Sequence, residues 1–371
     1  MTLTQPTHKI KFYKNLPDVF ESATNSGNRL HLSKLMGMSD VGKLLTIEGP
    51  VNRIDTDFAH HFDFTPVPTD YETNLSFDEV SLLAAENLWM KAKDKKIALF
   101  WSGGIDSTVA AVSLIMTNSE WQKQLVIYTS NYSVTKEYPL FYEQFLKDKV
   151  EIKFLTNHEF FNPELFSDEY VVVDGTCGDQ LWGCNVLADM MDVADKPYQE
   201  LFYHDVFKKI YKRGSKLSLK NNTINYIEKL VEMFPIKTTS IAELYWLLTF
   251  THKWDVVRLR HTSYIKDVTK FGKMNAFFNT ENFQRWTMCN ADKRLQKEWK
   301  TYKQPAKDFI YTFTKDSEYQ INKLQHESLG RSIPIGHPQS YVRAVTTSEH
   351  QLMDDIDMKK TNVILNRCLK I

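Results

Sequence analysis

Short apolar runs alternate with a strongly apolar helical stretch through the middle of the chain. The segment from Ser107 to Met116 is apolar nearly all round and predicts a buried helix, and Leu140 to Leu146 predicts a second helix. The predicted strands are Ile97–Trp101, Leu125–Thr129, Ile152–Leu155 and Tyr170–Val173. Strands and helices that alternate at this spacing predict βαβ crossovers, and therefore an α/β fold with a parallel sheet.

The segment ahead of this region, residues 1–75, is rich in Thr, Asn, Asp and His, and its apolar pieces are short. It predicts an N-terminal extension packed on the main body through a proline-containing connector that ends near Asp70. A helix is expected next, because Ser76 and Glu79 have the spacing of a capping box ahead of apolar residues at helical intervals.

Beyond the alternating core, assigned to residues 76–190, the pattern becomes helical and aromatic over 191–371. We expect this C-terminal part to complete a site built on the core. Within it, Tyr245 to Leu248 is typical of a helix core, although such a cluster can also stack on a base. The expected helices are Tyr198–Tyr211, Ile224–Phe234, Ile241–Leu259 and a stretch around Phe277–Lys300.

Composition is ordinary for a globular protein, with 42% apolar residues, 25% charged residues and a formal net charge of zero. This balance supplies no electrostatic argument for nucleic acid as a partner. A local basic cluster is either a solvated helix face or a contact for an anionic partner, and comprises Lys208, Lys209, Lys212 and Arg213.

The four cysteines include no CxxC pair and are too scattered for a disulfide framework, which favours a reducing, cytoplasmic compartment. The first residues contain no apolar signal segment. The longest apolar stretch, Ile241 to Phe250, is about half a membrane span. We therefore expect a cytoplasmic protein without a membrane role.

The chemistry is concentrated in the turn that follows the first predicted strand, Ser102-Gly103-Gly104-Ile105-Asp106-Ser107. Two glycines let several backbone N–H groups face one point, and the following helix adds the positive end of its dipole. Such a turn is suited to phosphate. The hydroxyls of Ser102, Ser107 and Thr108 are further donors. Asp106 would repel phosphate alone, but it fits a site in which Mg²⁺ bridges to the phosphates.

This turn resembles the SGGxDS signature of the N-type ATP pyrophosphatases, or PP-loop enzymes, rather than a Walker A loop, since no GK[ST] follows. The resemblance implies a Rossmann-like sheet with helices on both faces, of the adenine nucleotide alpha hydrolase-like type. It also implies cleavage of ATP between the α- and β-phosphates.

A second motif follows the fourth predicted strand and runs from Gly175 to Gly183 (GTCGDQLWG). It is similar to the GEGSDELFGG turn in the synthetase domain of asparagine synthetase and its relatives, the β-lactam synthetases and lasso-peptide cyclases. By this resemblance Gly175 belongs to the nucleotide site, and Asp179 joins Asp106 in holding Mg²⁺. Two carboxylates at adjacent strand ends are suited to one divalent cation.

A weaker resemblance lies near the C-terminus. Phe278 to Trp286 is similar to the family's PFLD…F stretch, and Lys307 to Tyr311 is similar to its KyiLR segment, whose lysine meets the pyrophosphate. Lys307 is therefore the expected cation for the leaving group, with Lys303 as the alternative. An exposed helix lysine is an equal possibility for Lys307.

Three positions depart from the family pattern. Thr176 replaces a glutamate that is suited to handle the proton of the incoming amine, and Gln180 replaces the next glutamate. Asp174 either supplies that base or is a satisfied carboxylate at a strand end. We also expect no glutaminase half of the family's kind, because residue 2 is Thr and the first cysteine is Cys177.

The expected function is an asparagine-synthetase-like ligase that uses ATP and Mg²⁺ to adenylate a substrate carboxylate and forms an amide. Its acceptor is a small molecule, and the amine comes from free ammonia, a separate glutaminase or a substrate amine. Two alternatives stay open: a nucleobase- or tRNA-modifying ATP pyrophosphatase, and a nucleotide-binding protein that has lost catalysis.

Overall fold

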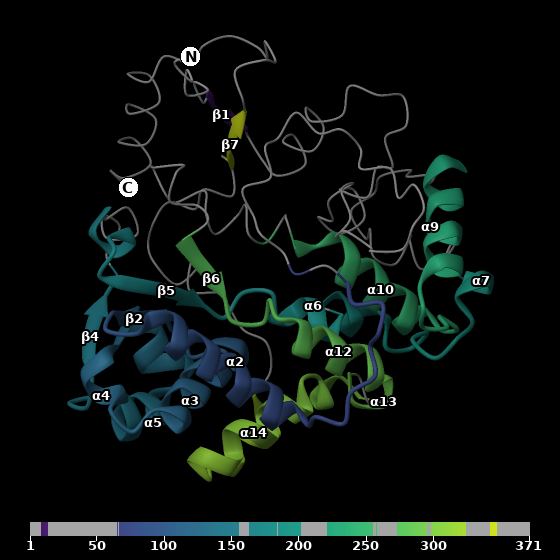
Figure 1. The fold of residues 1–371 in the computed structure, drawn as a ribbon. Coiled ribbons are helices and arrows are strands. Elements are labelled where there is room, and N and C mark those ends of the chain that lie inside the picture. The colour runs from purple at the N-terminus through teal and green to yellow at the C-terminus, as the bar shows by residue number, and fades with distance from the viewer. Residues whose placement is uncertain are drawn as a thin grey trace, which may run out of the picture.

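The structure, a computed structural model, contains a sheet of five parallel strands, with helices of the C-terminal part beside it (Figure 1). An antiparallel ribbon of β1 (Lys9–Tyr13) and β7 (Val342–Thr346) is also described. The described residues are 9–13, 65, 67–155, 163–183, 185–201, 221–254, 257, 273–294, 298–323 and 342–346.

The five-stranded sheet has the order β4-β3-β2-β5-β6, and every neighbouring pair is parallel. Four strands lie where the apolar runs predict them, which confirms the α/β class. The fifth strand, β6, was not expected. The strands are β2 (Lys96–Phe100), β3 (Leu125–Thr129), β4 (Glu151–Phe154), β5 (Tyr170–Asp174) and β6 (Met274–Ala276).

The position of β2 determines where a ligand can approach the sheet. From β2 the chain continues to β3 and β4 on one side, and it later adds β5 and β6 on the other. The turns that follow β2 and β5 therefore leave adjacent strands in opposite directions, which makes this a topological switch point. Crevices form at the carboxyl ends of the strands at such points.

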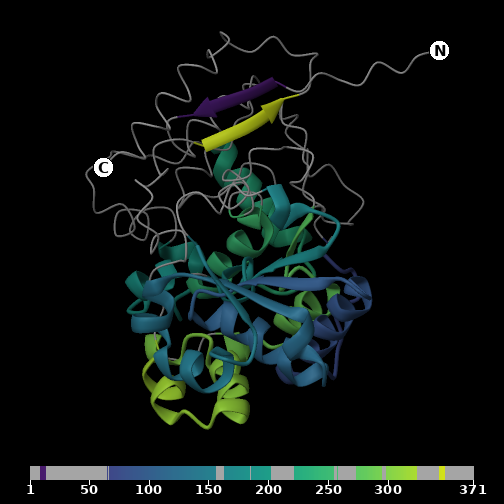
Figure 2. The same ribbon diagram turned by 90° about the vertical axis from the view of Figure 1, so that its left-hand side faces the viewer.

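Alternation along β2 divides its side chains between two apolar clusters. Ile97 and Leu99 face the larger cluster, which includes apolar residues of the helices α2 (Phe77–Ala92) and α3 (Ile105–Thr117). Ala98 and Phe100 face a smaller cluster covered by the 3-10 helix η5 (Pro163–Phe166). In Figure 2 the strands form a layer with α-helices packed beneath it. Both faces of the sheet are thus covered by helical segments.

The first helix, α2, begins as the capping-box pattern predicts. The Ser76 side chain accepts from the Glu79 N–H at 3.2 Å, and the Glu79 carboxylate accepts from the Ser76 N–H at 2.7 Å. The helix expected over 140–146 is a short helix, α5 (Pro139–Phe141), followed by a π-helical turn. The other elements before residue 202 are α4 (Trp121–Gln124), the π-helical turns η2 (Ser133–Glu137) and η3 (Tyr142–Leu146), α6 (Gly178–Trp182), the 3-10 helix η6 (Asn185–Met190) and α7 (Tyr198–Leu201).

The described residues of the C-terminal part are mostly helical, as predicted. The helix expected over 241–259 is interrupted, since α10 stops at His252, and Trp254 and Val257 are helical again. The single helical stretch expected around 277–300 is divided into several elements. The elements are α9 (Asn221–Met233), α10 (Ile241–His252), α12 (Glu281–Cys289), α13 (Ala291–Arg294), the 3-10 helix η9 (Trp299–Thr301), α14 (Gln304–Thr314) and α15 (Ser317–Asn322).

The predicted connector lies against α12. Thr65 donates two hydrogen bonds of 3.2 Å to Asn279, from its N–H and its hydroxyl, and the Gln284 amide donates to the Thr65 carbonyl at 3.1 Å. The rest of the expected extension, apart from β1 and 67–75, lies outside the described residues, as does the basic cluster at 208–213. Within the described ranges, every helix is too short or too polar to cross a lipid bilayer.

Candidate active site

The glycine turn after β2 leads directly into α3, as the sequence predicts. Gly103 has a φ of 74°, a conformation that favours glycine, and a Cβ there would lie 2.7 Å from the Glu137 Cβ. The Ser107 hydroxyl donates to the Gly104 carbonyl and accepts from the Ser102 N–H, both at 3.1 Å. No side chain caps the N-terminus of α3. The helix therefore presents its positive end at the turn.

Of the expected hydroxyl donors, Thr108 has a structural contact. It is fully buried, and its Oγ1 accepts a hydrogen bond of 3.1 Å from the Trp101 indole. Ser102 and Ser107 lie 2.9 Å apart through their hydroxyls, at the turn itself. The structure thus brings two of the three predicted hydroxyls together at the loop.

The turn after β5 packs directly on the start of α3. A Cβ on Gly175 would come within 2.7 Å of the Ser107 nitrogen. Cys177, the residue before α6, has a left-handed backbone with φ of 71°. This sharp turn brings the N-terminus of α6, which contains Asp179, beside Asp106.

The two predicted carboxylates converge on one ammonium group. The Lys303 Nζ lies 2.7 and 2.6 Å from the two carboxylate oxygens of Asp106 and 2.7 Å from Oδ1 of Asp179. The Lys303 side chain is 3% exposed, against 21% for Asp106 and 28% for Asp179. The cation is thus enclosed, while its partners keep some access to solvent.

Two carboxylates share the Lys303 ammonium in this cluster, so the ionisation of each affects the other. Burial raises the pKa of Asp106 to about 6, although the Lys303 charge opposes the rise and Asp179 adds to it. Burial also disfavours the ionised form of Asp179, but Lys303, Lys253 and a hydrogen bond from Tyr302 outweigh it and hold the Asp179 pKa below its usual range.

The segment before α14 positions Lys303. The Tyr302 hydroxyl donates to Asp179 at 3.2 Å, and its ring stacks on Trp299 with centroids 4.3 Å apart. Lys303 has a left-handed backbone, with φ of 57°. Lys307, the lysine expected from the resemblance, is fully buried, and its Nζ donates to the Lys300 carbonyl at 2.6 Å. Lys307 therefore holds the turn, whereas Lys303 contacts the carboxylates.

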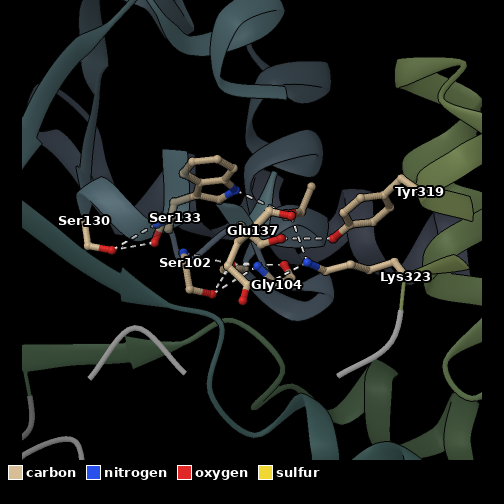
Figure 3. A network of polar contacts seen from close by, with 11 residues as sticks. Ser102, Gly104, Ser130, Ser133, Glu137, Tyr319 and Lys323 are labelled. Carbon is tan, nitrogen blue, oxygen red and sulfur yellow. Dashed lines mark hydrogen bonds and ion pairs between the residues drawn. The ribbon is translucent and has the colours of Figure 1, made fainter. Parts of the chain in front are cut away.

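A second buried ion pair supports the glycine turn from outside (Figure 3). The Lys323 Nζ contacts the Glu137 carboxylate at 2.6 Å and its carbonyl at 2.9 Å. The Tyr319 hydroxyl donates to the Gly103 carbonyl at 3.2 Å, and its ring stacks on Tyr138 with centroids 3.8 Å apart. Helix α15 is thus linked to the backbone of the glycine turn.

The three positions that depart from the pattern of the resembled motif also have clear contacts. The Asp174 carboxylate accepts from the Thr176 N–H at 3.1 Å and from its hydroxyl at 2.5 Å, so it closes the turn at the end of β5. These contacts favour the interpretation of Asp174 as a satisfied strand-end carboxylate. The Gln180 amide donates to the Lys253 carbonyl at 3.2 Å.

The donor set can be tested for a divalent cation. Asp106 and Asp179 both place oxygens around one cationic atom, and oxygen ligands are those that Mg²⁺ prefers. Within the described ranges no group of three His, Cys, Asp or Glu side chains has the arrangement of a metal site. A Mg²⁺ ion with two protein carboxylates and phosphate oxygens as ligands fits this set, as Mg²⁺ usually binds through one or two carboxylates plus substrate phosphates.

Sequence reasoning named Lys303 only as the alternative to Lys307, and it missed the part that α15 contributes. Pro305 at the start of α14 is a helix-start signal that places Lys303 at the cap, but nothing local connects that cap with Asp106. Glu137, Tyr319 and Lys323 have no motif around them. Comparison of the chain with protein families, with curated proteins and with solved structures finds no match.

Proposed function

We propose that the chain is an ATP-dependent ligase that adenylates a substrate carboxylate, releases pyrophosphate and forms an amide with ammonia or an amine. One observation supports this most strongly: Asp106 and Asp179 follow adjacent strands and converge on a single cation beside an uncapped helix N-terminus. An anion site next to a pair of carboxylates matches a nucleotide that binds with a divalent cation.

The reaction would have two steps. A carboxylate oxygen attacks the α-phosphorus of ATP, the bond from that phosphorus to the bridging oxygen breaks, and pyrophosphate leaves. An amine nitrogen then attacks the acyl carbon, AMP leaves with the carboxylate oxygen, and the nitrogen loses a proton. The products are an amide, AMP and pyrophosphate.

The protein's part would be alignment and charge neutralisation. The N–H groups of the glycine turn and the positive end of α3 would bind the outer phosphates. Lys303, with its Nζ already enclosed at the site, would offset charge on the leaving pyrophosphate. Asp106 and Asp179 would hold Mg²⁺, which supplies further neutralisation of the phosphates when bound.

The Rossmann-like sheet supports this proposal by its topology, since the glycine turn lies at a switch point where α/β proteins bind ligands. The resemblance of SGGIDS and GTCGDQLWG to the PP-loop enzymes supplies the reaction type. The nitrogen source, free ammonia or a separate glutaminase, is part of the same proposal.

The test is a pyrophosphate-release screen with Mg²⁺ and ATP over amino acids and small carboxylic acids, each with and without ammonia. Asp106→Asn should abolish the signal, because the cation loses a charged ligand. Asp168→Asn, at an aspartate whose side chain is 91% exposed, is the matched control and should keep full activity. A full rate in Asp106→Asn would reject the proposal.

The same screen separates the alternatives. Pyrophosphate release that requires tRNA would identify a tRNA-modifying enzyme instead. Tight ATP binding without pyrophosphate from any acceptor would identify a nucleotide-binding protein without this catalysis.

A further inference from the structure

A buried arginine lies beyond the helix that contains Asp179. Arg294, at the end of α13, is 4% exposed, and its guanidinium carbon lies 3.5 Å from the centre of the Trp246 ring. Its Nε is buried and has no hydrogen-bond partner, and among the described residues no carboxylate forms an ion pair with it. Burial lowers the pKa of Arg294 to about 9, despite the more distant charges of Glu243 and Asp292.

An arginine in this setting is costly to the folded protein. Transfer of a guanidinium from water needs a counter-charge or a full set of acceptors, and stacking on an indole ring replaces only part of that. The Trp246 ring covers one face of the Arg294 guanidinium. The N–H groups at the edge of a guanidinium are those that donate to carboxylates. The missing partner is therefore an acceptor in the plane of the guanidinium.

Other unmatched polar atoms gather on the same elements. Seven buried side-chain atoms lack a hydrogen-bond partner in the described part of the chain, and five of them are on α6, α10, α12 and α13. These five are Gln180 Oε1, Trp182 Nε1, Thr249 Oγ1, Gln284 Oε1 and Arg294 Nε. Buried polar atoms are normally satisfied, so these elements have unused hydrogen-bonding capacity, of which Arg294 carries the only charged part.

The same elements are bound to the helix of Asp179. The Trp246 indole and the Thr287 hydroxyl both donate to the Leu181 carbonyl, at 3.2 and 2.6 Å. Leu181 is two residues after Asp179 on α6. Trp246 thus contacts both the guanidinium and the short helix that contributes a carboxylate to the cation cluster.

We propose that Arg294, presented on Trp246, binds a carboxylate of the acceptor substrate. The acceptor is then a small organic acid with one carboxylate for recognition and another for activation. A planar carboxylate matches the guanidinium fork with two parallel hydrogen bonds. The identification of the ligand as the acceptor rests on the proposed function.

The test measures thermal unfolding without ATP, at constant ionic strength, with succinate, L-aspartate and L-glutamate as separate probes. At least one probe should raise the melting temperature of the wild-type protein. Arg294→Met should lose that response, and its melting temperature without ligand should equal or exceed that of the wild type, because an unpaired buried charge is removed. Arg294→Lys, which keeps the charge but not the fork, should bind about tenfold more weakly.

The control is Arg285→Met on α12, at an arginine paired with Glu281 and Asp70, and it should keep the wild-type response. A wild-type protein that responds to none of the probes, or an Arg294→Met protein that still responds, would overturn the proposal. If Arg294→Met does not fold, the test is Arg294→Lys. An affinity of Arg294→Lys for the acid probe equal to that of the wild type would also overturn the proposal.

Pyrophosphate assays distinguish this proposal from the function itself. Acid binding that depends on Arg294, without pyrophosphate release, would support the carboxylate site and reject the ligase. Pyrophosphate release with an unchanged KM for the acceptor in Arg294→Lys would support the ligase and reject the role of Arg294.

Discussion

A Cβ atom on Gly178 would overlap the carboxylate of Asp106. The two residues are far apart in the sequence, yet the turn after β5 packs so closely on α3 that only hydrogen fits between them. The absence of a side chain at residue 178 is therefore a condition for the position of Asp106.

Gly178→Ala should displace the Asp106 carboxylate and reduce pyrophosphate release at least about tenfold, in line with the sensitivity of reactions to small misplacements. We also expect a loss of about 1–3 kcal/mol in unfolding free energy from overpacking. Pyrophosphate release and urea denaturation are the measurements. If the Gly178→Ala variant kept the wild-type rate and stability, the turn after β5 and helix α3 could move apart without loss of either.

Lys303→Met should leave the carboxylates of Asp106 and Asp179 without their cation. Removing one partner of a buried ion pair costs about 3–5 kcal/mol, and partial exposure of the carboxylates reduces this to about 2 kcal/mol. Added Mg²⁺, without ATP, should raise the melting temperature of Lys303→Met more than that of the wild type, because the ion replaces the missing charge.

The matched control for this experiment is Lys307→Met, one helical turn later. It removes a hydrogen bond to the Lys300 carbonyl but no contact with a carboxylate. Its melting temperature should not respond to Mg²⁺ beyond the wild-type response. A larger response in Lys307→Met than in Lys303→Met would restore Lys307 as the cation of the site.

The Glu137–Lys323 pair should behave as a coupled unit. Lys323→Met leaves a buried carboxylate unpaired and should lower the unfolding free energy by about 3–5 kcal/mol. Combining it with Glu137→Gln should recover part of that loss, since the remaining side chain is neutral. A double-mutant cycle by urea denaturation measures the coupling, and strictly additive losses would argue against it.

His252 should make the protein sensitive to acid. It is 1% exposed, and burial lowers its pKa to about 3 in the folded state, against about 6.5 when unfolded. Between pH 3 and 6.5, His252 therefore binds a proton in the unfolded chain but not in the folded protein. The stability from neutral His252 is complete above about pH 6.5 and is lost as the pH falls toward 3, by about 1.4 kcal/mol per unit.

His252→Gln should remove this contribution. Between pH 6.5 and 5 the wild-type protein should lose about 2 kcal/mol more than the variant, measured by urea denaturation at each pH. Equal pH dependence in the two proteins would mean that His252 takes up a proton without unfolding. Other titrating groups affect both proteins alike, so the difference isolates this residue.

Local pattern was sufficient for four of the five strands and for the glycine turn. Neighbouring residues determine this part of the fold, because the apolar run of β2, the two glycines and the apolar helix α3 follow one another directly in the sequence. The short strand β6 was missed because three residues are too few to show an alternation of apolar and polar positions. It is stabilised by pairing with β5, about a hundred positions earlier in the chain.

The choice between Lys303 and Lys307 shows the same limit at the site. Both lysines flank the start of α14, and the motif resemblance favours the second. Which lysine contacts Asp106 depends on the left-handed backbone at Lys303 and on the packing of α14 against α3. Neither feature can be recognised from the neighbouring residues. The interaction between Glu137 and Lys323, 186 positions apart, was equally inaccessible.

The separation of 197 positions between Asp106 and Lys303 has a consequence for biosynthesis. A ribosome that adds about 5–20 residues per second needs about 10–40 seconds to deliver the lysine after the aspartate has emerged. During that interval the sheet can assemble, but its two acidic groups repel each other. Premature termination before Lys303 would thus yield a nascent chain whose candidate site is incomplete and which chaperones and proteases can recognise.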